Sequence, residues 1–249
     1  MWKTLKRWFH QLGSPRTFYR FAGVLIPWLL AAMVVTLTWG LYQSLWVAPP
    51  DYQQGESYRI LYVHVPAAWM GLFIYVLMAV SGLIGLVWRM KVAELVAISC
   101  APIGAAYTFV TLVTGSLWGK PMWGTWWEWD ARLTSELFLL FLYLGVMGLY
   151  TAIEDRRKAA RAAALLALVG VVNLPIIHYS VVWWNTLHQG ATVKLFSGES
   201  HMHPSMLKAL LIMTFATKFH FGVALLQKVR ARILQQESKA GWVQELIDE

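Results

Sequence analysis

Charged residues are scarce in this sequence, and their scarcity argues against a soluble globular protein. Asp, Glu, Lys and Arg make up 14% of the 249 residues, whereas hydrophobic residues make up 58%. A typical soluble domain carries about 25% charged residues. The mean hydropathy of +0.50 points the same way. The composition therefore predicts an integral membrane protein.

The sequence lacks the residues for thiol chemistry and for ATP binding. Cys100 is the only cysteine, so no disulfide can form within the chain and thiol redox chemistry is not expected. The sequence also has no Gly-x-x-x-x-Gly-Lys-Ser/Thr motif for binding ATP phosphates. We expect a chain that is not itself an enzyme, and any energy input must come from another polypeptide.

Six apolar segments are long enough to cross a bilayer core of about 30 Å, which takes about 20 helical residues. They predict an all-α integral membrane protein with six transmembrane helices that form one domain over residues 1–249. The first segment exceeds the apolar region of a signal peptide and lacks a convincing cleavage site, so we expect an uncleaved anchor. The predicted spans are residues 21–47, 61–88, 95–118, 133–152, 162–184 and 205–227.

The net charge of +8 would raise the question of nucleic acid binding in a soluble protein. Here the basic residues flank the spans, so we expect contact with membrane lipid and no nucleic acid. The positive-inside rule places both termini in the cytoplasm of a bacterium, and residues 1–12 have the spacing of an amphipathic interfacial helix. Fifteen of the 21 basic residues lie on that side: Lys3, Lys6, Arg7, Arg16, Arg20, Arg89, Lys91, Arg156, Arg157, Lys158, Arg161, Lys228, Arg230, Arg232 and Lys239.

A tryptophan-rich stretch at residues 123–130 lies between two spans, on the opposite, periplasmic side of the inner membrane. It reads Trp-Gly-Thr-Trp-Trp-Glu-Trp-Asp, with indoles at Trp123, Trp126, Trp127 and Trp129. Flat rings at this density can form a surface for a large flat ligand, and Gly124 permits a close approach or a positive φ. The alternative is an aromatic belt at the membrane interface.

Further unusual residues occur on the same side. His64 and His188 fall at the outer ends of the second and fifth spans, and Arg59 and Arg132 flank the outer connections. An ionisable side chain at a membrane boundary suggests a functional site. A planar ligand with a central metal and acidic edge groups would need two imidazoles, indoles along its plane, and arginines for its carboxylates. Heme is such a ligand.

Other polar residues allow simpler interpretations. Thr134 can cap the fourth span, and Glu136 is either placed at a positive helix end or paired with another helix. His201 and His203 could bind a metal, but no third ligand completes the set. His178 is expected to be a hydrogen-bonded core histidine. Lys218 is deep in the sixth span and needs a partner or a wet cavity.

The sequence resembles the CcmC (heme exporter protein C) family of the cytochrome c maturation system. Three motifs carry the resemblance: His-Val-Pro-Ala-Ala-Trp at 64–69, Trp-Gly-x-Trp-Trp-x-Trp-Asp at 123–130, and Trp-Trp-Asn-Thr-Leu-His-Gln-Gly at 183–190. The resemblance implies a non-catalytic subunit of an ATP-dependent ABC-type complex, with His64 and His188 as axial ligands of heme b. It also implies a tryptophan platform with Gly124 and Asp130. Arg59 and Arg132 are the candidate propionate partners.

The same resemblance implies partners. They are the heme chaperone CcmE, to which heme is delivered, the ABC subunits CcmA and CcmB, and the small membrane protein CcmD. Two rival interpretations remain open. In a membrane b-type cytochrome, heme would stay bound and carry electrons, and His178 and His220 are the nearest candidates for its ligands. In a solute permease, the tryptophans would form only a belt.

Overall fold

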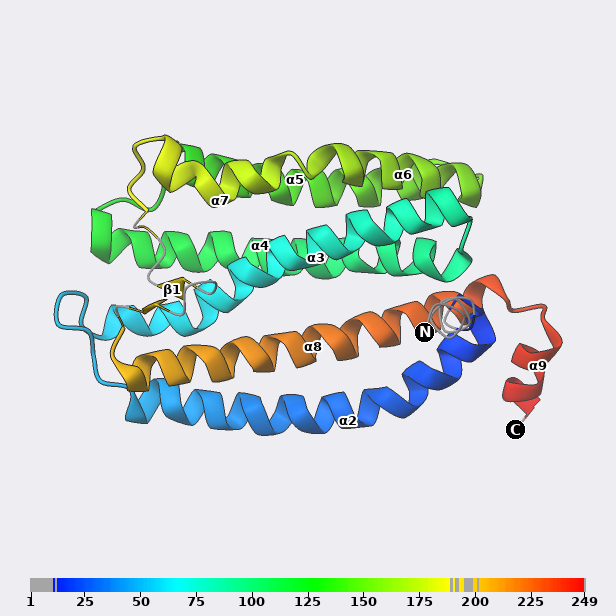
Figure 1. The fold of residues 1–249 in the computed structure, drawn as a ribbon, viewed down its shortest axis with the longest axis horizontal. Helices are drawn as coiled ribbons and strands as arrows, with labels where there is room; N and C mark the ends of the chain where they lie inside the picture. Colours follow the sequence, from blue (N-terminus) through cyan, green and yellow to red (C-terminus); the bar gives the residue numbers. More distant parts are fainter. Residues whose placement is uncertain are drawn as a thin grey trace.

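The computed structural model describes residues 11, 13–188, 190, 193–194, 199–200 and 202–248, which form a bundle of long, roughly parallel helices (Figure 1). Six segments are long and apolar enough to cross a membrane, which confirms the predicted fold class. The segment 1–12, which has the spacing of an amphipathic helix, lies outside the described residues, apart from residue 11. The elements are α2 (Pro15–Tyr42), the π-helix η1 (Gln43–Val47), the 3-10 helix η2 (Glu56–Ile60), α3 (Leu61–Trp88), α4 (Lys91–Trp123), α5 (Ala131–Ala152), α6 (Arg156–Gly170), α7 (Asn173–Trp183), β1 (Val193–Lys194), β2 (Glu199–Ser200), α8 (Pro204–Gln236) and α9 (Gly241–Asp248).

The third span is longer than the sequence suggested. The predicted span ended at residue 118, whereas α4 continues to Trp123. Pro121 is the third residue from the end of α4. It removes one backbone N–H donor, and only in the last turn. The helix ends at Gly124, whose φ of 76° is left-handed.

The fifth span consists of two helices rather than one. α6 ends at Gly170, and α7 begins at Asn173 after a two-residue turn. The Asn173 side chain donates a hydrogen bond of 2.9 Å to the carbonyl of Ser135 in α5. Pro175 lies in the first turn of α7, where a missing N–H costs little. Because of this interruption, α7 begins as a separate helix beside α5.

The main core lies among α3, α4, α5 and α6. The rings of Tyr75 and Tyr143 meet edge to face there, with centroids 5.1 Å apart. Tyr143 lies directly over Gly104, where a Cβ would come within 2.1 Å of its ring, and its hydroxyl donates to the carbonyl of Gly71. Small residues allow helices to approach closely in a membrane protein. The buried alanines of α6 serve the same purpose: Ala159, Ala160, Ala163, Ala164 and Ala167.

α2 and α8 lie side by side along one edge of the bundle (Figure 1). They approach closely at Gly40, where a Cβ would meet the sulfur of Met213 at 2.6 Å. Ala22, Ile26 and Gly40 are the buried residues of α2. Large apolar side chains such as Trp28, which is 72% exposed, cover its outer face. Such a face suits contact with lipid.

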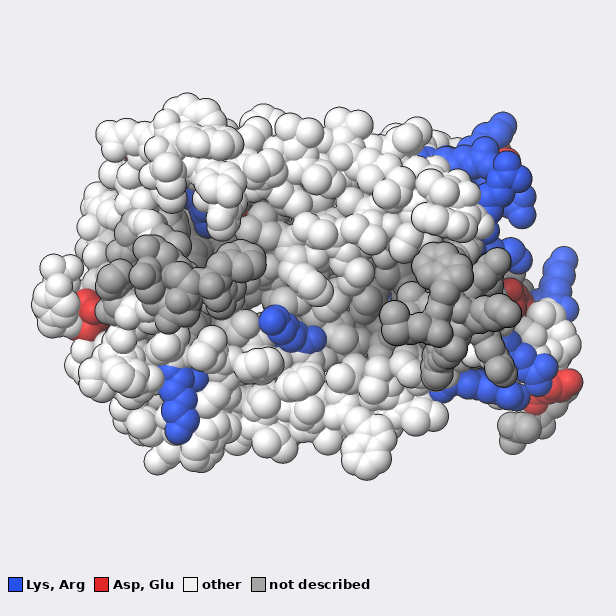
Figure 2. Space-filling view, viewed as in Figure 1, with Lys and Arg blue, Asp and Glu red and all other residues white. Residues whose placement is uncertain are grey.

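Charge separates the two ends of the bundle. Basic side chains gather at the end where α2 begins and where α9 lies, and few occur elsewhere on the face shown in Figure 2. We call this the basic end. The opposite end carries the connections that precede η2, α5 and β1, and is called the site end below. All ten residues predicted for the heme site belong to segments at the site end.

Candidate functional site

His64 lies in the first turns of α3 and is only 8% exposed. Its Nδ1 is 3.0 Å from the hydroxyl oxygen of Thr114 on α4. That hydroxyl donates its single proton to a backbone carbonyl, at 2.6 Å from the carbonyl of Val110, so it can only accept from His64. We therefore assign the proton of the neutral ring to Nδ1. This tautomer leaves the lone pair of Nε2 free to bind a metal.

One face of α4 forms a socket for the His64 ring. Gly115 lies against it, because a Cβ there would be 3.1 Å from the His64 Cε1. The ring of Trp118 packs edge to face on the imidazole, with centroids 5.7 Å apart. The indole N–H of Trp118 donates to the side-chain oxygen of Gln54, in the loop before η2, at 2.9 Å. The ring of His64 is thus held on two sides before any ligand binds.

The tryptophan stretch begins on α4 and then leaves the helix. Trp123 is the last residue of α4, and Gly124 adopts the left-handed conformation that ends the helix. The Gly124 N–H bonds to the carbonyl of Lys120 at 3.1 Å. Other residues pay a steric cost at this φ, which explains the glycine within a run of indoles.

The four indoles differ in exposure. Trp126 is 55% exposed and Trp129 is 73% exposed, whereas Trp123 and Trp127 are half-buried. The Trp127 Nε1 is buried and has no hydrogen-bond partner within the described part of the chain. A buried indole N–H usually finds an acceptor. This donor is therefore available to an acidic group of a ligand.

Asp130 joins the tryptophan stretch to the segment that carries His188. One carboxylate oxygen accepts from the N–H of Leu133 at 2.8 Å and caps α5. The other accepts from the N–H of Leu187 at 3.1 Å. Leu187 directly precedes His188, so one carboxylate fixes both the start of α5 and the position of the second predicted heme ligand.

His188 lies after the end of α7 and is half-buried. Its ring is 6.4 Å from that of Trp123, with the planes tilted by 54°. His188 and Arg132 are both near enough to His64 for their charges to act on its imidazole. The structure therefore brings together residues from α3, α4, α5 and the segment after α7.

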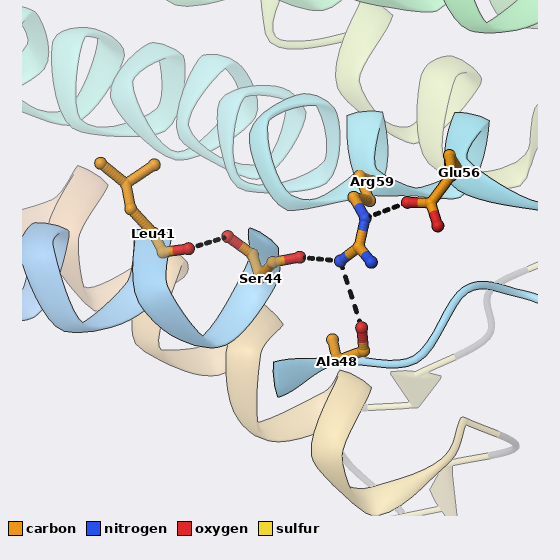
Figure 3. Close-up of polar contacts among 5 residues, drawn as sticks. All are labelled: Leu41, Ser44, Ala48, Glu56 and Arg59. Carbon is orange, nitrogen blue, oxygen red and sulfur yellow. Dashed lines mark hydrogen bonds and ion pairs between the residues drawn. The ribbon is translucent and has the colours of Figure 1, made fainter. Parts of the chain in front are cut away.

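The two predicted arginines already have protein partners. Arg59 pairs with Glu56 and donates to the carbonyls of Ser44 and Ala48, the latter at 3.1 Å (Figure 3). It thereby holds the end of η1 against η2. Arg132 donates to the carbonyl of Ile177 in α7 at 2.6 Å. A guanidinium has five N–H donors, so this bond leaves Arg132 with donors for a ligand.

Two secondary expectations are wrong: Thr134 does not cap α5, and His178, which was expected in the core, is exposed. Asp130, rather than Thr134, caps α5, because it precedes the helix with an extended backbone and Thr134 already lies inside the first turn. His203 caps α8 through its Nδ1, which accepts from the N–H of Ser205. His201 lies outside the described residues. Within the described part of the chain, no group of three metal-binding side chains occurs.

Sequence reasoning missed the residues that support His64. Thr114, Gly115 and Trp118 have the spacing of one helix face, which was the available signal. In the structure, Gly115 makes room for an imidazole.

Comparison with known proteins identifies the family. The family model described as CcmC, heme exporter protein C, matches residues 8–244. The chain belongs to the heme exporter protein C family. It is 55% identical to heme exporter protein C of Escherichia coli K12 over 247 residues, which cover 99% of this chain and 98% of that protein.

Two further relatives carry the same name. Heme exporter protein C of Bradyrhizobium diazoefficiens is 50% identical over 92% of this chain and 86% of its own length. The Haemophilus influenzae protein is 47% identical over 99% of this chain and 98% of its own length. The family match at residues 8–244 spans the histidines, the tryptophan stretch and all six membrane helices. The family resemblance therefore applies to the whole architecture rather than to one motif.

Proposed function

We propose that this chain holds heme at the site end and delivers it during cytochrome c maturation. The observation that carries the proposal is the placement of His188 beside the indole of Trp123 and near enough to His64, from a separate part of the chain, for its charge to act on that imidazole. The relatives are named heme exporters. Both the family and the residue set favour a transport component rather than a catalyst, with the six helices acting as one domain.

Several features of the site suit heme b. The Nε2 of His64 can ligate iron while Thr114 holds the other ring nitrogen, and His188 is the second axial ligand. Heme propionates need donors, and the buried Trp127 N–H and the remaining N–H groups of Arg132 are available. Arg59 is assigned to the rim of the site, where its contacts hold the first outer loop.

The same surface suits release. Trp126 and Trp129 are more than half exposed, and Glu128 between them is also exposed, so an acceptor protein can reach them. A carrier must orient heme yet leave an edge accessible. The half-buried indoles, Trp123 and Trp127, complete the platform with Gly124. In this arrangement the buried side chains hold heme, and the exposed side chains meet the acceptor.

The orientation and the partners form part of the proposal. The basic end would face the cytoplasm of a bacterium by the positive-inside rule, which puts the site end on the periplasmic face of the inner membrane. Heme would pass there to the chaperone CcmE. The chain has no ATP-binding motif, so the ABC subunits CcmA and CcmB, with CcmD, would supply the energy-coupled release.

Transfer of heme tests the proposed function. We expect the protein purified from membranes to carry a Soret absorption band, and heme to appear on added apo-CcmE in a time-dependent reaction. Heme that withstands repeated reduction and oxidation but never moves to the chaperone would instead indicate a b-type cytochrome. Absence of pigment in freshly purified protein would favour a permease. His178 and His220, the ligands considered for a cytochrome, are both exposed.

Gly115→Ala should weaken heme binding without breaking the fold. The added Cβ would lie 3.1 Å from the His64 ring, which must shift by a few tenths of an ångström. Overpacking of this kind costs about 1 kcal/mol, which corresponds to a roughly fivefold loss of affinity. Titration of the apoprotein with hemin measures the change.

Gly148→Ala is the matched control for this substitution. Gly148 lies in α5, and a Cβ there would meet nothing within 4 Å. We expect unchanged heme affinity and an equal or slightly higher melting temperature, because alanine favours a helix over glycine. Equal heme affinity in the Gly115 and Gly148 variants would show that the α4 socket does not position His64.

A further inference from the structure

Lys218 lies in the middle of α8, on the surface of the bundle. Its side chain is exposed. Away from the basic end, Figure 2 shows only scattered basic side chains on this face. The proposed heme site does not use Lys218. An exposed lysine within a membrane span is costly and calls for a specific explanation.

The depth of Lys218 follows from the spacing of lysines along α8. Lys208 and Lys228 lie ten residues before and after it, and each is about 15 Å away along the helix axis. Together they bracket about 30 Å, the thickness of a bilayer core. Lys218 is thus near the centre, and its side chain, about 6 Å long, cannot reach either interface by snorkelling.

Nothing in the described part of the chain neutralises Lys218. Its ammonium lies 5.7 Å from the ring centroid of Phe215. The nearby polar groups are engaged with each other, because the Tyr107 hydroxyl is 2.8 Å from the Nδ1 of His220 and 3.0 Å from the carbonyl of Thr217. The ion pairs among the described residues all lie near the ends of the helices: Arg16–Glu245, Arg59–Glu56 and Lys91–Glu237.

A second copy of this chain could not supply the missing carboxylate. Within the six described spans, Glu56 and Glu94 lie in the first turn of their segments. Glu136 is deeper, but it is only 5% exposed and faces the interior of the bundle. No acidic side chain is therefore presented to lipid at mid-depth. The partner of Lys218 must be a different polypeptide.

The surface around Lys218 has the shape of a helix-docking face. Leu211, Phe215 and Lys218 follow the spacing of one helix face and are all exposed. The other faces of α8 pack within the bundle: Phe221 meets Phe73 of α3, and Tyr107 of α4 meets Thr217 and His220. We propose that this Leu211–Phe215–Lys218 face binds a transmembrane helix of another subunit, one that carries an Asp or Glu near its middle.

Three substitutions at Lys218 test this proposal in the complex as it is isolated. Lys218→Met should lower the recovery of one membrane partner, after mild detergent solubilisation, by at least about tenfold, whereas Lys218→Arg should retain it. The chain alone should keep its heme spectrum in both variants. Lys218→Met should not impair folding, because Lys218 is exposed and methionine is an apolar side chain that suits a membrane span.

The control and the charge swap identify the partner. Lys208→Met changes an exposed lysine near the start of the same helix and should leave the complex intact. Lys218→Glu should lose the partner and regain it when the partner's mid-span acid is replaced by Lys. Wild-type complex composition in Lys218→Met would overturn the proposal. So would a loss of heme from the isolated Lys218→Met chain, which would make a heme carboxylate the partner.

Discussion

Replacement of His64 by alanine is expected to leave the purified protein almost without heme. The ring of His64 is held by three residues of α4, namely Thr114, Gly115 and Trp118. Loss of a residue that only orients a ligand weakens metal affinity about 10- to 100-fold, so loss of the ligand itself should reduce bound heme to below about a tenth of the wild-type amount. The ratio of Soret absorbance to protein concentration measures the amount of bound heme.

Two companion variants separate ligation from folding. Thr114→Val removes the acceptor for the Nδ1 proton with little change in volume and should cause an intermediate loss of about tenfold in affinity. His178→Ala removes an exposed histidine of α7 and should have no effect. Added imidazole can occupy the space left in His64→Ala and should partly restore the spectrum. Full heme content in His64→Ala would show that another residue binds the iron.

Asp130→Ala should release His188 as well as weaken the start of α5. The carboxylate accepts hydrogen bonds from Leu133 and from Leu187. An N-cap contributes about 1 kcal/mol and a further hydrogen bond to a charged group about 1.5 kcal/mol. We expect a lower melting temperature and a shift of ferric heme from low spin toward high spin, because the second axial ligand is no longer held. Absorption spectra of the loaded protein report the spin state.

Asp130→Asn distinguishes the two roles of the carboxylate. Asparagine caps helices as well as aspartate does, but its single carbonyl oxygen cannot replace both acceptors. The melting temperature should therefore stay near that of the wild type while the heme spectrum changes. Asp155 caps α6 at the basic end, so Asp155→Asn is the control and should leave the spectrum unaltered. An unchanged spectrum in Asp130→Ala would mean that His188 does not depend on this contact.

The sequence predicted the fold because membrane spans impose a simple pattern. Each of the six spans needs about 20 apolar residues, and no soluble structure competes for such a composition. The ends of the helices were harder to place. α4 extends through Pro121, and α6 and α7 are separated at residues 171–172. Both outcomes depend on contacts between helices, such as that of Asn173 with Ser135, which periodicity alone does not reveal.

The candidate site was predictable in composition but not in detail. Histidines, indoles and arginines at the same ends of several spans could be recognised along the chain, whereas their hydrogen-bond partners could not. The contact of Asp130 with Leu187 joins residues 57 positions apart. The partners of Arg59 could not be predicted from the sequence, because the carbonyls that it contacts become available only where η1 ends. Such a partner exists only in the folded chain.

Electron paramagnetic resonance of the ferric, heme-loaded protein tests most directly whether two imidazoles share one iron. The account predicts a low-spin signal typical of bis-histidine ligation, which disappears when either His64 or His188 is replaced by alanine. A low-spin signal that persists in both variants, or a high-spin signal in the wild-type protein, would contradict it.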